Sequence, residues 1–372
     1  MTLFAGLMSG TSLDGVDGVL VDFASPQGPP IKVLAHHHQP FPAPLRTELL
    51  ALNAPGDNEL QRAALAANAI ARSYAEVVHA LLHGAGCGAD QVRAIGAHGQ
   101  TVRHRPGEFD GTGFTTQLLN GALLAELTGI DVVCDLRTRD LAAGGQGAPL
   151  APGLHAALFA VPGESRAVLN LGGIANLTVL GPEGTVLGFD CGPANALLDA
   201  WCLRHRGTAL DDGGRWAASG QVIEPLLAVL LVHPYFSQLP PKSTGRDLFN
   251  ASWLDAQLAR HAPAAAPVDV QATLAALTIG SIAQDVQRHA SQASMLLVCG
   301  GGAHNLHVME GLASRLPGLR VATTADYGLP VEQVEGAAFA WLAQRRVERL
   351  PANIVSVTGA RAERVLGAVY PA

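Results

Sequence analysis

The chain has 372 residues, of which 48% are hydrophobic and 15% charged, so it can bury large cores and is not intrinsically disordered as a whole. Its 31 acidic and 24 basic residues leave a formal net charge of -7, which argues against nucleic acid or an anionic membrane surface as a partner. Only two basic residues are lysines, Lys32 and Lys242, and neither ends a Gly-x-x-x-x-Gly-Lys pattern, which excludes a P-loop.

The first predicted elements form a hairpin. Residues 3–7 and 15–23 are apolar runs separated by a turn, which predicts two strands of a buried sheet, and 31–34 would extend that sheet. Residues 58–82 carry apolar side chains at helical spacing, which predicts one long helix. A further strand is predicted at 92–97.

Strands and helices then alternate, as in α/β proteins. Helices are predicted at 120–127 and 152–159, with strands at 131–133 and 166–171. The pattern of strand, Gly-rich turn and strand recurs at 169–180, which suggests that the chain contains a duplication. The remaining predicted elements are a strand at 186–190, helices at 194–204, 224–232 and 269–288, a strand at 295–299, a long helix at 331–349 and a short terminal strand.

The five cysteines are widely spaced and include no Cys-x-x-Cys pair, so we expect reduced, buried thiols and neither disulfides nor a zinc site. The first 31 residues contain no lysine or arginine, and the longest apolar run is too short to span a bilayer. We therefore expect a soluble, cytoplasmic protein. The length is roughly two to three times that of a usual single domain, which predicts two domains.

The turn of the first hairpin, residues 8–17, is rich in Gly, Ser and Thr. Such a turn can point backbone N–H groups and hydroxyls at phosphate oxygens and bind an anion without a lysine. Asp14 or Asp17 would then hold Mg²⁺ through water. An ordinary hairpin with turn-forming residues is the alternative, and the sequence does not decide between the two.

Three consecutive glycines, Gly300 to Gly302, follow the apolar strand predicted at 295–299. They remove every side chain from that surface, which permits close approach of a flat ring or a ribose. A flexible turn is the alternative, but a turn rarely needs three glycines.

Asp190 ends a predicted strand just before a helix. Strand ends facing a cleft are where α/β enzymes place reactive groups, and a single carboxylate there suits a general base. Helix capping is the alternative, but Asp190 comes early for a cap of the helix predicted at 194–204. We therefore favour a catalytic role.

Polar residues also follow two other predicted strands, at 98–104 and at 135–137 with 142–149. Because both groups follow strands, both can reach one cleft and offer the many hydrogen-bond donors that a sugar requires. The histidines at 36–38 are predicted to form a surface run near a strand end, without paired carboxylates, and not a metal site.

Six segments, some of them weak signals individually, are jointly specific: Gly6–Asp17, His98–Thr101, Ala143–Leu150, Asn170–Asn176, Pro241–Arg246 and Ser356–Ala360. With these segments the chain resembles the anhydro-N-acetylmuramic acid kinases, a branch of the sugar kinase, actin and heat-shock ATPase superfamily. The resemblance covers almost the whole chain. Departures from the family pattern fall at Leu136, Cys191 and Ala194, and they leave the reactive groups intact.

The resemblance implies an α/β fold with two actin-like (ribonuclease H-like) domains and a nucleotide cleft between them. Domain I is expected to comprise 1–133 and the C-terminal segment 340–372, and domain II 134–339. ATP and Mg²⁺ are the implied cofactors, with Asp14 as the metal-binding residue. The implied nucleotide-binding residues are Gly10, Thr11, Ser12, Leu13, Asp14, Gly15, Val16 and Asp17 in the first hairpin, Gly172 and Gly173 in the second, and Gly300, Gly301 and Gly302 beside the adenosine.

The implied reaction opens the 1,6-anhydro bridge of the sugar with water and phosphorylates O6, giving N-acetylmuramic acid 6-phosphate for cell-wall recycling. The resemblance implies that Asp190 is the catalytic base and that His98, Arg137 and Glu335 bind the sugar. A homodimer is also expected. Two alternatives stay open: an ordinary hexose kinase of the same superfamily, in which Asp190 deprotonates a hydroxyl, and a non-enzymatic actin-like nucleotide switch.

Overall fold

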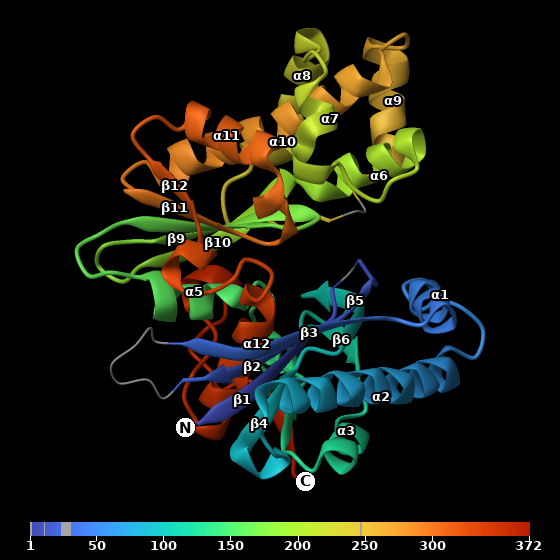
Figure 1. Ribbon diagram of the computed structural model, residues 1–372, viewed down its shortest axis with the longest axis vertical. Helices are drawn as coiled ribbons and strands as arrows, with labels where there is room; N and C mark the ends of the chain where they lie inside the picture. The colour runs from blue at the N-terminus through green and yellow to red at the C-terminus, as the bar shows by residue number, and fades with distance from the viewer. Residues whose placement is uncertain (1, 11, 24–30, 246–247) are drawn as a thin grey trace. The chain divides into compact units, whose positions relative to one another are not determined.

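The computed structural model describes residues 2–10, 12–23, 31–245 and 248–372. It contains two compact units: unit 1 comprises Met1–Leu158 and Gln333–Ala372, and unit 2 comprises Phe159–Glu332. Both units combine a sheet with helices (Figure 1). Residues 134–158 and 333–339, which were expected in the second domain, belong to unit 1 in this division. Strand pairing and helix packing within unit 1 account for that difference.

Unit 1 contains a six-stranded sheet in the order β13-β7-β4-β1-β2-β3. Strands β1, β2 and β3 form an antiparallel meander, and β4 and β7 continue the sheet in parallel from β1. The strands are β1 Leu3–Met8, β2 Gly15–Asp22, β3 Lys32–Pro40, β4 Val92–Ala97, β7 Val132–Cys134 and β13 Ala368–Tyr370, with a separate hairpin of β5 Gln100–Pro106 and β6 Gly113–Leu118.

The helices of unit 1 cover both faces of its sheet. Helix α2 packs on β2 and β3, while α12 packs on β1 and β4. Helix α12 lies so close to the sheet that a Cβ at Gly6 or Gly96 would collide with its backbone. Glycine at these two positions permits this close packing. The helices are α1 Ala43–Ala51, α2 Glu59–Ala85, α3 Gly121–Thr128, α4 Thr138–Ala142, α5 Ala151–Phe159, α12 Val334–Val347 and α13 Val355–Thr358, with the 3-10 helix η1 Ala89–Gln91.

Unit 2 repeats the strand order of unit 1. Its sheet has the order β10-β9-β8-β11-β12, with an antiparallel meander of β8, β9 and β10 and the parallel strands β11 and β12. Numbered within each unit, the first five strands of both sheets therefore follow the order 3-2-1-4-5, which agrees with the predicted duplication. The strands are β8 Arg166–Leu171, β9 Ile174–Leu180, β10 Val186–Pro193, β11 Met295–Cys299 and β12 Arg320–Thr323.

The longest helix of unit 2, α10, packs against β9, β10 and four other helices. The helices are α6 Asn195–Arg206, α7 Arg215–Ala218, α8 Glu224–Leu231, α9 Ala251–His261, α10 Pro267–His289 and α11 Leu306–Arg315. The 3-10 helices are η2 Asp212–Gly214, η3 Pro234–Ser237, η4 Gly301–His304 and η5 Thr324–Tyr327. The repeated sheets with helices on them confirm the predicted α/β fold of two actin-like domains.

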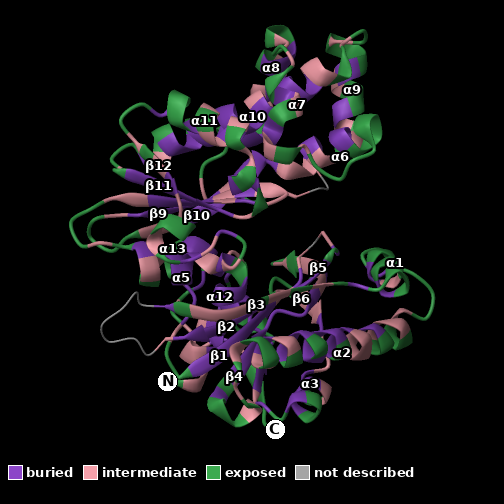
Figure 2. Cartoon of the chain, in the orientation of Figure 1, coloured by how far each residue is buried: buried purple, intermediate pink, exposed green. Residues whose placement is uncertain are grey.

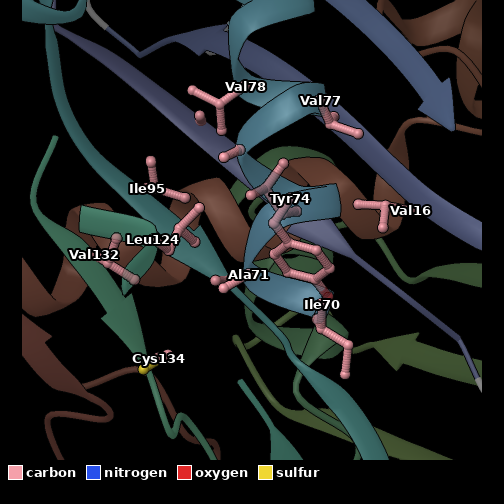
Figure 3. Packing of buried hydrophobic residues seen from close by; sticks show 14 of the residues in the cluster. Val16, Ile70, Ala71, Tyr74, Val77, Val78, Ile95, Leu124, Val132 and Cys134 are labelled. Atoms are coloured by element: carbon pink, nitrogen blue, oxygen red, sulfur yellow. The ribbon is translucent and has the colours of Figure 1, made fainter. Parts of the chain in front are cut away.

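One core of unit 1 lies between α2 and the sheet (Figure 3). Ile70, Tyr74, Val77 and Leu81 recur at helical spacing along α2 and are at most 1% exposed. Each such side chain contributes about 2 kcal/mol through burial. The central strands are buried along most of their length, whereas the outer side of α2 is exposed (Figure 2). This packing fixes the carboxyl ends of β1 and β4, where polar residues follow.

Most predicted elements are confirmed, including both hairpins, the long helix α2 and the strands β4, β8 and β11. Residues 98–104, which include most of β5, were expected only as a polar segment because they lack a continuous apolar face. Several other elements, among them β6, β12, α1 and α9, were not predicted. All five cysteines are free, and four of them are buried. In the part of the chain that the structure describes, no helix is both long and apolar enough to cross a membrane.

Candidate functional site

The turn between β1 and β2 is held by polar contacts to neighbouring elements. The Gly10 carbonyl accepts hydrogen bonds from Leu13 N at 3.2 Å and from Gln100 Nε2 at 3.0 Å. Leu13 adopts φ 57°, and the side chains of Leu13 and Val16 are buried in the core, so only their backbone is available to a ligand. Thr11, the remaining predicted turn residue, lies outside the described residues.

Asp14 has an exposed carboxylate with one oxygen already engaged. Its Oδ1 accepts hydrogen bonds from Ser12 Oγ at 2.7 Å and from Gly15 N at 3.1 Å. Among the described residues, no hydrogen bond reaches Oδ2. Mg²⁺ binds proteins through one or two carboxylates together with water and phosphate oxygens, so this donor set fits the ion.

The histidines of β3 lie opposite Asp17 of β2. Asp17 Oδ1 lies 3.0 Å from His38 Nδ1 and 3.5 Å from His36 Nε2, so the prediction that this run lacks a carboxylate partner was wrong. The cause is tertiary, because antiparallel pairing sets Asp17 directly opposite His38. Burial raises the pKa of Asp17, but the two histidines outweigh it and hold the pKa below its usual value. Over the described chain, no cluster of His, Cys, Asp and Glu suits a metal ion.

His98 and Arg137, which were predicted to bind the sugar, contact each other in unit 1. His98 Nδ1 lies 3.0 Å from the Ser9 carbonyl, and His98 Nε2 lies 2.9 Å from Arg137 Nη2. Since a carbonyl only accepts and a guanidinium only donates, His98 is the neutral tautomer with its proton on Nδ1. Arg137 Nη1 also donates to the Gly147 carbonyl at 2.8 Å.

The pKa values of this pair agree with that assignment. Burial, assisted by the charge of Arg137, lowers the pKa of His98 to about 3. Burial also lowers the pKa of Arg137 to about 10, against the opposing effect of Glu335 in the first turn of α12. The structure therefore brings all three predicted sugar-binding residues into one electrostatic group, in which Arg137 is charged and His98 neutral.

The Gly-rich segment 143–149 is anchored by Asp140, which is fully buried. Asp140 Oδ2 accepts from Gly147 N at 2.7 Å, and Oδ1 accepts from Asn353 Nδ2 at 2.7 Å and Thr358 Oγ1 at 2.8 Å. A buried carboxylate is tolerated when several donors satisfy it. This network holds the Gly147 carbonyl where Arg137 binds it.

In unit 2, the glycines predicted to bind nucleotide surround the start of α6. The Gly172 and Gly173 carbonyls accept hydrogen bonds from the backbone N–H groups of residues 194–196. Asn195 Nδ2 donates to the Leu171 carbonyl at 3.0 Å. A Cβ at Gly302 would lie 3.0 Å from Asn195 Nδ2, so both Gly-rich segments meet at this side chain.

The three glycines after β11 have different roles in the fold. Gly300 has φ 80° and would place a Cβ against Asn170 and Leu171, and a Cβ at Gly302 would lie 2.6 Å from Leu171 Cβ. Both positions need glycine for packing. Gly301 has no positive φ, and a Cβ there would meet no atom within 4 Å among the described residues. Gly301 is therefore the one whose missing side chain the fold does not require.

Asp190 lies on β10 at a bulge, where Cys191 is the extra residue opposite Ala175 and Asn176 of β9. Its Oδ2 accepts hydrogen bonds from Ser243 Oγ at 3.0 Å and from Thr244 N at 3.0 Å. Within residues 2–10, 12–23, 31–245 and 248–372, no hydrogen bond reaches Oδ1. Bulges occur next to active sites because they redirect a side chain.

The pKa of Asp190 is raised above its ordinary value. Burial is the main cause, and the donors Thr244 and Ser243 and the charge of Lys242 oppose it. A carboxylate with a raised pKa is a stronger base, and Oδ1 is the oxygen available to accept a proton. The geometry therefore suits a general base.

The sequence reasoning did not assign roles to five residues that shape these sites. Gln100 and Asp140 hold the loops of unit 1, while Lys242, Ser243 and Thr244 surround Asp190. Two segments gave a signal: His98–Thr101, which contains Gln100, and Pro241–Arg246, in which one of the two lysines precedes two hydroxyl residues. No local pattern marks Asp140, because its partners Asn353 and Thr358 are over 200 positions away.

A family model described as anhydro-N-acetylmuramic acid kinase matches residues 2–372. The chain belongs to this family of kinases. An anhydro-N-acetylmuramic acid kinase of Cupriavidus metallidurans is 61% identical over 99% of this chain and 97% of its own. Another, of Variovorax paradoxus, is 61% identical over 100% of this chain and 99% of its own. A third, of Ralstonia nicotianae, is 56% identical over 99% of this chain and 97% of its own.

The neutral state of His98 predicts a pH-dependent contribution to stability. The unfolded chain binds this proton near the ordinary pKa of about 6.5, whereas the folded chain binds it only near about 3. Between these pH values protonation favours the unfolded chain. The contribution of His98 to folding stability is therefore fully present above about pH 6.5 and is lost as the pH falls toward about 3. The Tm advantage of the wild type over His98→Asn should therefore be smaller at pH 5 than at pH 7. An equal advantage at both would contradict a neutral His98.

Proposed function

We propose that this chain uses ATP to open 1,6-anhydro-N-acetylmuramic acid and to phosphorylate O6, giving N-acetylmuramic acid 6-phosphate in cell-wall recycling. The observation that carries the proposal is the family match over residues 2–372, with relatives of that name at 61% identity along nearly their full lengths. The proposal places the reaction in the cytoplasm and in a homodimer.

In this proposal Asp190 Oδ1 accepts a proton from water, whose oxygen forms a bond to C1 of the sugar. The C1–O6 bond breaks, and O6 takes its electron pair. O6 then bonds to the γ-phosphorus of ATP while the bond to the β-phosphate oxygen breaks, and ADP leaves with that pair. One carboxylate suffices because O6 of an anhydro sugar carries no proton to remove.

The remaining groups bind and orient the reactants. His98, Arg137 and Glu335 contact the sugar, whose hydroxyl and carboxylate groups match the guanidinium of Arg137. The turn at 10–17, together with Gly172 and Gly173, offers backbone donors to the phosphates, and Gly300 to Gly302 adjoin the adenosine. Asp14 would hold Mg²⁺, which neutralises phosphate charge when bound.

Replacement of Asp190 tests the assignment of the base. Asp190→Asn should fold and bind ATP, yet lose turnover by roughly two to four orders of magnitude, because the amide accepts no proton from water at neutral pH. Steady-state kinetics and calorimetric titration of ATP measure both properties. Asp255→Asn, which removes a surface carboxylate of unit 2, is the matched control. A loss of less than about tenfold would show that Asp190 is not the base.

Gly301→Val tests the assignment of the glycine segment. A side chain at this position fits the fold, so its effect should come from the space that the adenosine needs. We expect nucleotide binding to weaken by at least about tenfold, with sugar binding nearly unchanged, in separate calorimetric titrations. Equal losses for both ligands would count against the assignment.

Isotope labelling tests the ring opening. In oxygen-18 water, the product should carry one label on the oxygen at C1 and none in its phosphate, since O6 keeps its original atom. Mass spectrometry must be fast enough to precede anomeric exchange. Label in released inorganic phosphate would indicate ATP hydrolysis, and a sugar phosphate without label would indicate direct transfer to an existing hydroxyl, as in an ordinary hexose kinase.

A further inference from the structure

Unit 2 contains a buried ion pair next to the segment that contacts Asp190. Lys242 Nζ lies 3.1 Å from Asp285 Oδ1 and 2.9 Å from Oδ2, and the two side chains are 1% and 2% exposed. The Lys242 ammonium also lies 5.1 Å from the ring centroid of Tyr235 and 5.5 Å from that of Phe189. An ammonium within about 6 Å of an aromatic ring is attracted by the negative face of that ring.

Stability alone does not explain this pair. Removing two charges from water costs free energy that their mutual attraction offsets only in part. Replacing such a pair by apolar residues of similar volume often leaves the folding stability unchanged or raises it. The chain also uses arginine for nearly all its other cations. A buried lysine therefore points to a positional role.

The backbone around Lys242 holds Asp190 at several atoms. The Lys242 carbonyl accepts from Asp190 N at 3.1 Å, and Tyr235 Oη donates to the Asp190 carbonyl at 2.7 Å. The next two residues, Ser243 and Thr244, donate to Asp190 Oδ2. This segment forms no helix or strand, so its position depends on what anchors Lys242.

The anchor is rigid because Asp285 lies on α10, a helix of 23 residues that packs on β10 itself. A side chain on a long packed helix moves little, so it can hold a loop at a fixed distance from the strand. The ion pair thus connects the loop of Ser243 and Thr244 to α10, which packs on β10, the strand of Asp190.

We propose that the Lys242–Asp285 ion pair positions the catalytic base: it holds Ser243 and Thr244 on Asp190 Oδ2 and so leaves Oδ1 as the oxygen that accepts the proton. This inference rests on the proposed role of Asp190. Lys242 and Asp285 are positioning residues, since they reach the reaction only through Asp190. The titratable groups that interact with Asp190 in the described chain are Lys242, Tyr235 and Cys191. Lys242 in turn faces Asp285 and His289 of α10 and Cys191 of β10.

The decisive variant replaces both charges at once. Lys242→Met with Asp285→Leu keeps similar volumes and removes one positive and one negative charge, so the net charge near Asp190 does not change. We expect a Tm close to that of the wild type, a kcat lower by about 100-fold, and KM values for ATP and sugar within about threefold of the wild-type values. A merely structural role would not produce this separation of kcat from KM.

The pH profile gives a second readout. Loss of the donors on Oδ2 removes contacts that favour the charged carboxylate, so the acidic limb of kcat/KM should move to higher pH by about one unit.

The substitution Ser243→Ala gives a third readout. It should lower kcat in the wild type and have little further effect in the double variant, because both changes act on one contact. Full multiplication of the two effects would overturn the proposal.

A surface pair of unit 2 serves as the matched control. Arg204 and Asp255 join α6 to α9 and are about half exposed, and replacing them by Met and Leu should leave kcat and the pH profile unchanged.

If the buried double variant fails to fold, Asp285→Asn decides the question. It keeps the side-chain size and should lower kcat at the pH plateau by about tenfold.

Wild-type kcat in the folded double variant or in Asp285→Asn would overturn the proposal. Asp190→Asn, assayed beside them, separates this failure from that of the proposed function. An inactive Asp190→Asn with a fully active double variant rejects the positioning role and keeps the base, whereas an active Asp190→Asn rejects the base itself.

Discussion

Buried polar groups need hydrogen-bond partners once water is excluded, and this constraint shapes the carboxyl ends of the central strands in both units. In unit 1, Ser9 Oγ after β1 donates to the Gly99 carbonyl and accepts from Tyr74 Oη of α2. The adjacent His98 is satisfied by Ser9 and Arg137. The same contacts that satisfy the buried groups also fix the positions of the groups proposed to act on the sugar.

Because the strand order is repeated, both units have two parallel strands whose carboxyl ends lie side by side. An antiparallel meander followed by parallel strands places two strand ends side by side, β1 with β4 and β8 with β11. Loops that leave such an edge can be brief and rich in glycine, because the sheet already supports them. The two units use the edge differently: unit 1 presents a charged arginine and a neutral histidine there, while unit 2 presents the glycines at 172–173 and 300–302.

Asp190, the proposed base, is held by contacts to three of its atoms. The bulge after Asp190 ends its regular pairing, and the segment 242–244 contacts its N, O and Oδ2 atoms together with Tyr235. Burial raises the pKa of Asp190, and the two donors limit the increase. This arrangement raises the basicity of the proposed base and leaves Oδ1 without a hydrogen bond from the described residues, as proton transfer requires.

The sequence by itself determined most of the elements and the family, because these depend on local periodicity and on short motifs. The spacing of apolar residues predicted α2, and Gly-rich turns between apolar runs predicted both hairpins and their repetition. Only the tertiary structure decided which polar groups meet. Asp17 meets His36 and His38 through strand register, and Asp140 meets Thr358 across 218 positions of the chain. Lys242 meets Asp285 because a loop folds onto a distant helix, and contacts of this kind leave no periodic signal in the sequence.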